Sequence, residues 1–281
     1  MTVRIVTDSS CDLPTELVQE LGITVVPLYV RFGEEVYREQ VDISLDEFYK
    51  RLEQGPIHPV TIQPSPQDFV TAYQKVASEA DGIVSIHISS KLSGTFNSAL
   101  QGKKLLEKDF PIEVVDSQII TVGLALICIA AAKMAKAGES LASVVEEVKQ
   151  MLPNIRLLAL LDTLKYLQKG GRIGKAKALL GSILNVKPMI TLKEGEVVPA
   201  GQTRSRSKGI ERLFSFVESV SNIEDLVIAY NTTPDEAQAL AERLGSILTK
   251  EAVKVIRLGT TLGVHMGPGG LAIGIREKKT V

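Results

Sequence analysis

The first half of the 281-residue chain alternates short runs rich in β-branched residues with stretches of helical spacing. Such alternation is typical of βαβ units, whose strands form a parallel sheet with helices packed on its faces. The runs that we expect to form strands are residues 3–7, 24–31, 82–88 and 112–116. The pattern therefore predicts an α/β domain over residues 1–155 with a doubly wound, mostly parallel sheet.

Capping residues mark several of the helix starts between these runs. Ser44 stands three residues before Glu47, which is the spacing of a capping box, and Ser65 is followed by a proline at the first helical position. The proline-rich residues 58–66 that lead into this second helix are expected to form a loop. An apolar run over 119–132 is shorter than the roughly 20 residues of a membrane span, so we expect a buried helix there.

From residue 156 the pattern changes to strands that follow one another more directly. Residues 187–192 and 197–203 are expected to pair as a hairpin across the turn at 193–196. The remaining segments are a helix over 205–219, a capping box over 233–236 and strands over 226–230, 253–258 and 270–276. We predict an α+β domain over residues 156–281, packed firmly against the first domain with a cleft between the two.

Composition and charge exclude some classes of protein. The 32 Lys and Arg residues against 33 Asp and Glu residues give a formal net charge of -1, so we expect no nucleic-acid partner. Aromatic residues make up only 5% of the chain and Trp is absent, which leaves aliphatic side chains to build the core. Because the chain opens without a basic and then apolar signal segment, we expect a cytoplasmic protein with Cys11 and Cys128 as free thiols.

Residues 89–94 place serines and a glycine between a predicted strand and a predicted helix. Free backbone N–H groups, the positive end of the helix dipole and the Ser93 hydroxyl would meet at one point, which suits an anion. Gly94 costs helix stability, and the close approach of a ligand to the backbone is one reason to accept that cost. The residues alone leave open the alternative that Ser93 is an ordinary helix cap.

Three further residues are candidates for contact with a small polar head group. Thr61 lies between two prolines that stiffen its loop, and Arg172 lies among glycines in a segment that lacks the spacing of a phosphate loop. His265 precedes a glycine-proline turn and could donate a hydrogen bond or carry a proton, but no zinc-ligand spacing accompanies it. Each also has an ordinary alternative, namely a surface threonine, a solvated basic turn and a structural histidine.

Arg204 and Arg206 form a compact pair at the start of the helix expected over 205–219, where we expect both to be exposed. They could contact a phosphate-bearing partner, although a solvated face is the default interpretation. The sequence contains no Ser-His-Asp order, no paired carboxylates at an obvious site and no dinucleotide-binding glycine motif. An independent catalyst is therefore weakly supported.

Taken together, six segments in sequence order resemble the DegV family, and the match spans the whole chain. They are Val6-Thr-Asp-Ser-Ser10, Thr61-Ile-Gln-Pro-Ser65, residues 89–98, Val115-Asp-Ser117, residues 167–174 and His265-Met-Gly-Pro-Gly269. The resemblance implies a two-domain DegV-like fold that binds a long-chain fatty acid at the cleft between its domains. Position 62 is isoleucine where the family usually has serine, so one secondary hydroxyl contact is missing here.

The resemblance also implies a role for each candidate residue. The carboxylate would be held by Thr61, Ser93 and the Gly94 N–H; Arg172 and His265 would lie at the exposed end of the head group; and Arg204 and Arg206 would meet a partner. That partner would be a fatty acid kinase that makes acyl phosphate for phospholipid metabolism. The chain itself would be a non-catalytic subunit without a cofactor, and transient contact with a membrane surface is compatible with this role.

Two other functions remain open from the sequence. One is an enzyme or kinase subunit that acts on a small carbonyl or hydroxy compound, with His265 as a base or covalent anchor. The other is a regulatory module that binds a protein partner and no lipid. A fatty acid agrees best with the aliphatic composition, because each buried methylene contributes about 0.8 kcal/mol.

Overall fold

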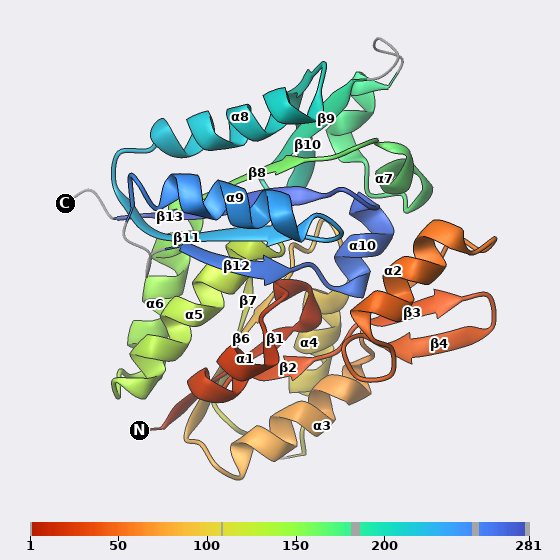
Figure 1. The fold of residues 1–281 in the computed structure, drawn as a ribbon. Coiled ribbons are helices and arrows are strands. Elements are labelled where there is room, and N and C mark those ends of the chain that lie inside the picture. The colour runs from red at the N-terminus through yellow and green to blue at the C-terminus, as the bar shows by residue number, and fades with distance from the viewer. Residues whose placement is uncertain (1, 108, 181–185, 249–252, 279–281) are drawn as a thin grey trace.

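The computed structural model describes residues 2–107, 109–180, 186–248 and 253–278. Its first sheet is fully parallel (Figure 1). Its order is β2-β1-β6-β7, formed by β2 (Thr24–Val26), β1 (Val3–Asp8), β6 (Gly82–His87) and β7 (Ile112–Asp116). Side chains alternate between the two faces, so that Ile5 and Val6 belong to different hydrophobic clusters. The doubly wound parallel sheet predicted from the sequence is confirmed.

Helices cover both faces of this sheet. One face carries α3 (Pro66–Ala77) and α4 (Thr95–Lys104), and the other carries α1 (Thr15–Leu21), α5 (Val122–Lys136) and α6 (Leu141–Met151). The expected buried helix is α5, which is buried along residues 122–132 because it packs against β1 on one side and against strands of the second sheet on the other. A helix enclosed in this way has no polar face.

The second sheet is mixed and has the order β10-β9-β8-β13-β11-β12. Its strands are β8 (Ile155–Leu160), β9 (Lys187–Lys193), β10 (Glu196–Thr203), β11 (Ile223–Tyr230), β12 (Val253–Arg257) and β13 (Leu271–Glu277). Helices α8 (Arg206–Glu218) and α9 (Pro234–Leu244) cover the face opposite α5. The predicted hairpin is present as β9 and β10, and Glu194 and Gly195 in its turn both have positive φ.

A third, antiparallel sheet of order β4-β3-β5 was not predicted. It consists of β3 (Tyr29–Phe32), β4 (Glu35–Arg38) and β5 (Val60–Ile62), with α2 (Leu45–Gln54) packed beside it. The single strand expected over 24–31 is wrong, because the chain leaves the first sheet at Pro27, which has no N–H for a ladder. The loop expected over 58–66 likewise contains β5, which pairs with β3.

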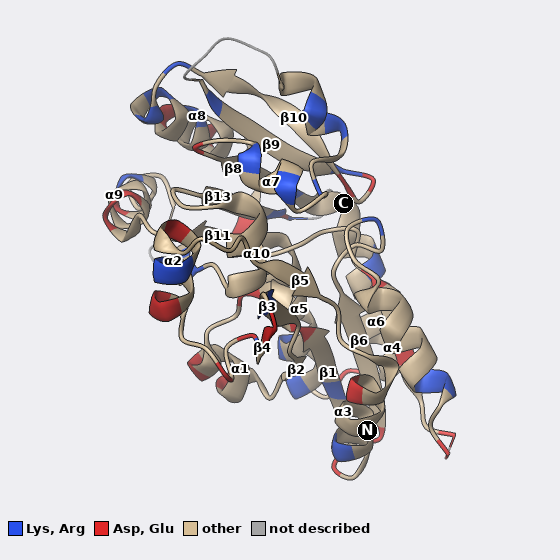
Figure 2. Cartoon of the chain, turned by 90° about the vertical axis from the view of Figure 1, so that its right-hand side faces the viewer, with Lys and Arg blue, Asp and Glu red and all other residues tan. Residues whose placement is uncertain are grey.

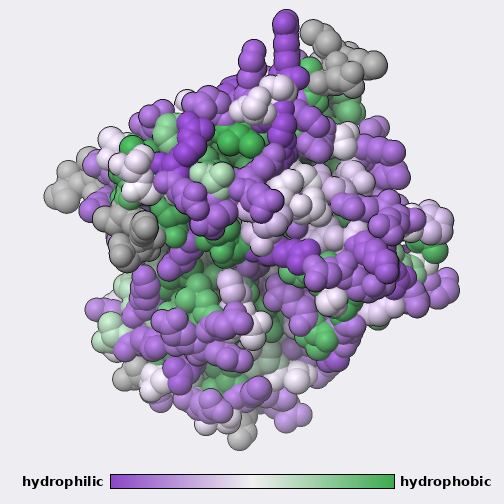
Figure 3. All heavy atoms as spheres, in the orientation of Figure 1, coloured by the Kyte–Doolittle hydropathy of each residue, from purple (hydrophilic) through white to green (hydrophobic). Residues whose placement is uncertain are grey.

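Five short helices complete the described chain. Two are α-helices near the cavity between the larger sheets, α7 (Lys165–Lys169) and α10 (Thr260–Met266). The other three are 3-10 helices, η1 (Ser9–Cys11), η2 (Leu152–Asn154) and η3 (Gly174–Leu179). Hydrophilic residues cover much of the face seen in Figure 3, with hydrophobic residues between them. In the described part of the chain, every helix is too short or too polar to span a membrane.

Candidate functional site

A cavity of about 290 Å³ lies between the parallel sheet and the mixed sheet. One wall is built by the loops that follow β2, β6 and β7 and includes Leu28, Ile88 and Ile120, so it lies at the carboxyl edge of the parallel sheet. Ligands in open α/β sheets bind at this edge. The opposite wall is the face of the mixed sheet that looks toward α5, with the aliphatic side chains Leu157, Ala159, Ile190, Leu192, Val197 and Ala272.

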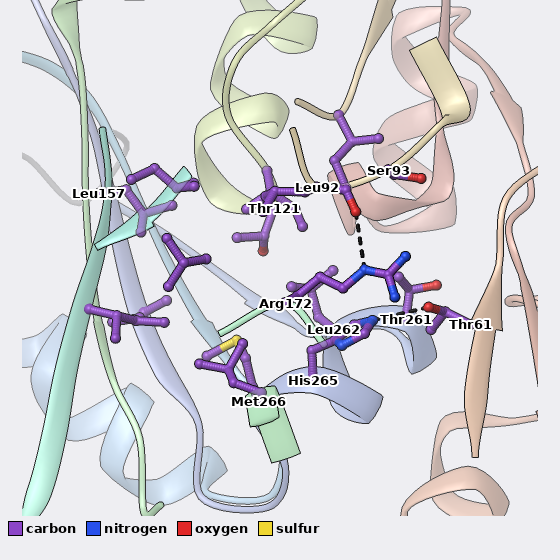
Figure 4. A pocket seen from close by; sticks show the side chains of 18 of the residues that line it. Thr61, Leu92, Ser93, Thr121, Leu157, Arg172, Thr261, Leu262, His265 and Met266 are labelled. Carbon is purple, nitrogen blue, oxygen red and sulfur yellow. Dashed lines mark hydrogen bonds between the residues drawn. The ribbon is translucent and has the colours of Figure 1, made fainter. Parts of the chain in front are cut away.

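Thr61 and His265 meet at one end of the cavity, as Figure 4 shows. Thr61 is held by the pairing of β5 with β3, and His265 belongs to the last turn of α10. The Thr61 Oγ1 and His265 Nε2 atoms are 3.0 Å apart and share a hydrogen bond. Two residues separated by 204 positions in the sequence thus form one polar pair.

His265 is a neutral imidazole at physiological pH. Burial lowers its pKa to about 4, and the positive charge of Arg172 and the neighbouring His58 act in the same direction. Its buried Nδ1 has no hydrogen-bond partner among the described residues and lies against Gly170, where any side chain would collide with it. The histidine can therefore exchange hydrogen bonds with a ligand but does not supply the positive charge that an anion needs.

Arg172 supplies a positive charge at the mouth of the cavity (Figure 4). Its Nε donates to the Leu92 carbonyl oxygen at 3.2 Å and its Nη1 donates to the Gly170 carbonyl oxygen at 2.9 Å. These bonds fix the guanidinium and use two of its five N–H donors. Exposed basic residues lie on the two short helices on either side of it in the sequence, α7 and η3: Lys165, Lys169, Lys175 and Lys177. Figure 2 shows Lys and Arg segments in blue at α7.

Ser93 lines the cavity directly before α4. The N-cap of α4 is Gly94 and makes no side-chain capping bond, while the Ser93 Oγ lies 2.8 Å from the Thr95 Oγ1 and accepts a hydrogen bond from the Thr95 N–H at 3.3 Å. The Ser93 hydroxyl therefore accepts from the first turn of α4 as a helix cap does, and it also lines the cavity.

Gly94 does not belong to the cavity wall, and a neighbouring side chain explains why it is glycine. The amide of Gln63 occupies the space that a Cβ at this position would need, and its Nε2 donates to the Ser98 Oγ at 3.0 Å. The close approach expected of a ligand is thus made by the protein itself. Gln63 also lines the cavity, although no local feature of the sequence marks it as a site residue.

The two arginines expected to be exposed together differ in their surroundings. Arg204 is exposed, and neither arginine lines the cavity. The side chain of Arg206 is only 19% exposed, and it donates to Glu236 at 2.6 Å and to the Gly269 carbonyl oxygen. The expectation of exposure is wrong for Arg206, because these intramolecular contacts hold it against α9.

These contacts also change the predicted capping box over 233–236. Thr233 is the N-cap of α9 but makes no side-chain bond to the helix. Its hydroxyl oxygen lies 3.4 Å from the Arg206 Nη2, and the Glu236 carboxylate is paired with the same guanidinium. The arginine has replaced the local backbone as the partner of both side chains, so the predicted capping bond is absent.

A buried hydrogen-bond chain has the order of a hydrolase triad although the sequence order did not suggest one. The His87 Nδ1 is 2.9 Å from the Asp8 Oδ2, and the His87 Nε2 is 2.6 Å from the Ser85 Oγ. The Ser85 Oγ also bonds to the Tyr73 hydroxyl at 2.8 Å, and Asp8, Ser85 and His87 have no exposed surface. A substrate cannot reach this serine, so the chain joins β1 to β6 as part of the core.

The fold and the cavity define a class, that of α/β proteins with an aliphatic pocket between two large sheets and a polar mouth. Within this class the chain belongs to the DegV family, because the family model described as "Uncharacterised protein, DegV family" matches residues 2–278. Among the described residues, no group of three or more His, Cys, Asp or Glu side chains is arranged to hold a metal ion.

Relatives and solved structures resemble this chain over nearly its whole length. A DegV domain-containing protein of Deinococcus radiodurans is 35% identical over 280 residues, which is 98% of each chain. A fatty-acid-binding DegV family protein of Thermus thermophilus is 36% identical with a TM-score of 0.90, over 99% of this chain and 100% of that one. DegV of Bacillus subtilis, a fatty acid binding protein, is 29% identical with a TM-score of 0.88 over the same shares.

Proposed function

We propose that this protein binds a long-chain fatty acid, with its carboxylate at the Thr61 and Ser93 end of the cavity and its chain between the two larger sheets. The observation that carries the proposal is an aliphatic cavity with a cluster of hydroxyl, imidazole and guanidinium groups at one end. Two structural relatives at 36% and 29% identity are fatty-acid-binding proteins, which supports the same ligand class here.

The energetics of such a ligand agree with this arrangement. Each methylene that leaves water for the aliphatic walls contributes about 0.8 kcal/mol, so a long chain supplies most of the affinity. The carboxylate must meet fixed donors, because burying an unpaired charge is expensive. The Thr61 and Ser93 hydroxyls are the donors that we assign to it, and Arg172 supplies the opposite charge at the mouth.

We further propose that the chain is a non-catalytic subunit that presents the carboxylate to a fatty acid kinase for acyl phosphate formation. Arg172 and the basic residues around it are exposed beside the cavity mouth, where an incoming phosphoryl group would need positive charge. Exposed Arg204 remains a candidate contact for the kinase. Arg206 is held by Glu236 and is better suited to supporting that surface than to touching the partner.

The alternative in which His265 acts as a base has less support. An activated base usually has a third group that orients it, and the buried Nδ1 of His265 has no such partner among the described residues. With a pKa of about 4, the imidazole is also a weak base for proton transfer near neutral pH. Lipid binding is therefore our primary proposal. Measured enzymatic turnover would contradict it.

The proposed cytoplasmic protein would take its ligand during transient contact with a membrane surface. The outer face of the sheet β4-β3-β5 supports this step, since Val36 and Val60 are 50% and 43% exposed and both pair with exposed Arg31. Apolar and cationic side chains on one face suit an anionic lipid surface. The same strand β5 carries Thr61 and Ile62, which line the cavity.

Native mass spectrometry of gently purified protein tests the primary proposal. We expect a mass excess that matches a fatty acid and, after delipidation, uptake of one equivalent of added oleate. Arg204→Ala, which changes a residue outside the cavity, is the matched control and should take up oleate as the unmodified protein does. Protein that carries no lipid and takes up no oleate would refute the proposal.

A further inference from the structure

Two buried carboxylates from distant parts of the chain hold the first turn of α10. Glu39, directly after β4, is 1% exposed, and Asp12, directly after η1, is 2% exposed. Helix α10 begins at the N-cap Gly259, which has no side chain to serve as a cap. The free N–H groups at a helix start need acceptors, and here these come from residues more than 200 positions away.

Glu39 receives four hydrogen bonds, three of them from α10. Its Oε1 accepts from the Thr261 N–H at 2.7 Å and from the Thr260 hydroxyl at 3.0 Å. Its Oε2 accepts from the Thr261 hydroxyl at 2.8 Å and from the Ser9 hydroxyl at 2.5 Å. A carboxylate that meets this many donors is one of the stronger anchors available to a buried backbone segment.

Asp12 completes the arrangement from the other side. Its Oδ1 accepts from the Gly259 N–H at 2.8 Å, while its buried Oδ2 has no partner among the described residues. Burial and the nearby charge of Glu39 raise the pKa of Asp12 well above its usual range. A side chain at Gly259 would collide with both carboxyl groups, which explains the glycine.

The anchored turn leads directly to the cavity. Thr261 and His265 are four residues apart in α10, so they lie on the same face of the helix one turn from each other. The helix contributes Thr261, Leu262, His265 and Met266 to the cavity wall. Whatever fixes Thr261 therefore also fixes the direction in which His265 meets Thr61.

We propose that Glu39 is a positioning residue, which anchors the first turn of α10 and thereby holds His265 against Thr61 at the mouth of the cavity, with Asp12 as a second acceptor at Gly259. The claim about His265 depends only on the contacts of α10. The claim that ligand affinity follows rests on the proposed function.

The alternative is that Glu39 stabilises the fold without any specific effect on the site. Replacing a buried, hydrogen-bonded carboxylate residue by alanine destabilises most proteins. A fall in melting temperature therefore does not distinguish the two roles. The pKa of His265 does distinguish them. A ring that leaves its buried contact regains water, and its pKa then returns toward the ordinary value of about 6.5.

The experiment compares Glu39→Ala, Glu39→Gln and Thr260→Val with Ser140→Ala, which removes the side-chain cap of α6 away from the cavity. The first readout is the pKa of His265 in delipidated protein, followed by NMR of the imidazole. The second is oleate affinity by calorimetry. Thr260→Val removes one of the four bonds without touching the cavity wall, so it answers the question if Glu39→Ala does not fold.

We expect Glu39→Ala to raise the His265 pKa toward its ordinary value and to weaken oleate binding about tenfold, the scale of a lost helix cap. Thr260→Val should shift both readouts in the same direction by less. Glu39→Gln should keep affinity within about threefold, because its amide oxygen still accepts from the Thr261 N–H. Ser140→Ala should lower the melting temperature and leave both readouts unchanged.

An unchanged His265 pKa in Glu39→Ala, or in Thr260→Val if the alanine variant does not fold, would overturn the positioning role. An equal change in Ser140→Ala would overturn it as well, because the effect would then follow from general destabilisation. If the unmodified protein binds no oleate, the proposed function fails, whereas the His265 titration still decides the role of Glu39.

Discussion

The Thr61 and His265 pair brings together two chemically different groups, a rotating hydroxyl and a neutral imidazole. The Thr61 hydroxyl has one hydrogen, so when it donates this hydrogen to a carboxylate, His265 must carry its proton on Nε2 and donate to the Thr61 oxygen. Positive charge comes from Arg172 at the mouth instead. Hydrogen bonding and charge compensation are thus assigned to different residues in the proposed site, which substitutions can separate.

Substitutions of the hydroxyl residues should weaken fatty acid binding more than substitution of the arginine. Thr61→Val and Ser93→Ala each remove a donor assigned to the carboxylate, and we expect a loss of about tenfold or more in oleate affinity. Arg172→Ala should weaken binding less than these two substitutions do, and it should reduce phosphoryl transfer by the partner kinase more than it reduces binding. Calorimetry and a kinase assay on the same samples measure both effects, and an equal loss of binding in all three variants would contradict this division of roles.

The low pKa of His265 has a consequence for stability in acid. The unfolded chain binds a proton on this histidine below about pH 6.5, whereas the folded protein binds it only near pH 4. The contribution of neutral His265 to the free energy of unfolding is therefore fully present above about pH 6.5 and is lost as the pH falls from about 6.5 to about 4. The full loss amounts to roughly 3 kcal/mol. Asp12 and Glu39, whose pKa values are raised, act in the opposite direction over part of this range.

His265→Gln isolates the histidine from the two carboxyl groups. We expect the unmodified protein to lose more free energy of unfolding than this variant when the pH falls from 7 to 4, as measured by urea denaturation at each pH. Parallel pH profiles for the two proteins would show that the His265 ring is not buried as a neutral group.

At the scale of secondary structure, local signals located most of the elements. Ser44 and Ser65 cap their helices as predicted, although the reciprocal bond of a capping box is present only between Ser65 and Asp68 and not between Ser44 and Glu47. The turn at Glu194 and Gly195 forms the expected hairpin. What could not be predicted depends on distant partners. The helix α10 has its acceptors on Glu39 and Asp12, and the three residues of β5 are a strand only because β3 lies beside them.

The same reason applies to the candidate site. Ser93 and Arg172 had local signals, namely a helix start and a glycine-rich turn, and both line the cavity. Gln63 had none, because its role beside Gly94 appears only when β5 and α4 come together. The resemblance to a family brought Thr61 and His265 to one place, and spacing in the sequence alone gave no reason to pair them.

Arg206 illustrates how an apparent surface residue becomes part of the framework. Because its guanidinium joins the start of α8 to Glu236 on α9, Arg206→Ala should lower the free energy of unfolding by roughly 2 to 4 kcal/mol. Arg204→Ala should change it by no more than about 0.5 kcal/mol. Chemical denaturation measures both, and similar stability of the two variants would contradict the framework role.

At the scale of the whole molecule, α5 belongs to both of the larger sheets. Ile5 and Val84 of the parallel sheet and Val227 and Ala272 of the mixed sheet lie in one hydrophobic cluster with this helix. We propose that the division into residues 1–155 and 156–281 describes two structural halves that share a core. The walls of the cavity come from both halves, so ligand binding should depend on their contact.

A shared core predicts a single unfolding transition. Denaturation followed by far-UV circular dichroism and by tyrosine fluorescence should give coincident curves, because neither half can bury its face toward α5 alone. Addition of oleate should move the whole transition to higher denaturant concentration. Two separated transitions, of which only one responds to oleate, would show that the halves are independent.

We propose that a fatty acid lies in this cavity with its carboxylate at Thr61 and Ser93. A crystal structure of the delipidated protein saturated with oleate tests it most directly. We predict carboxylate oxygens within hydrogen-bond distance of the Thr61 Oγ1 and the Ser93 hydroxyl, and a chain that runs between Leu157 and Ile190 of the mixed sheet and the loops after β6 and β7. Oleate bound outside the cavity, or bound with its methyl end beside Thr61, would contradict the claim.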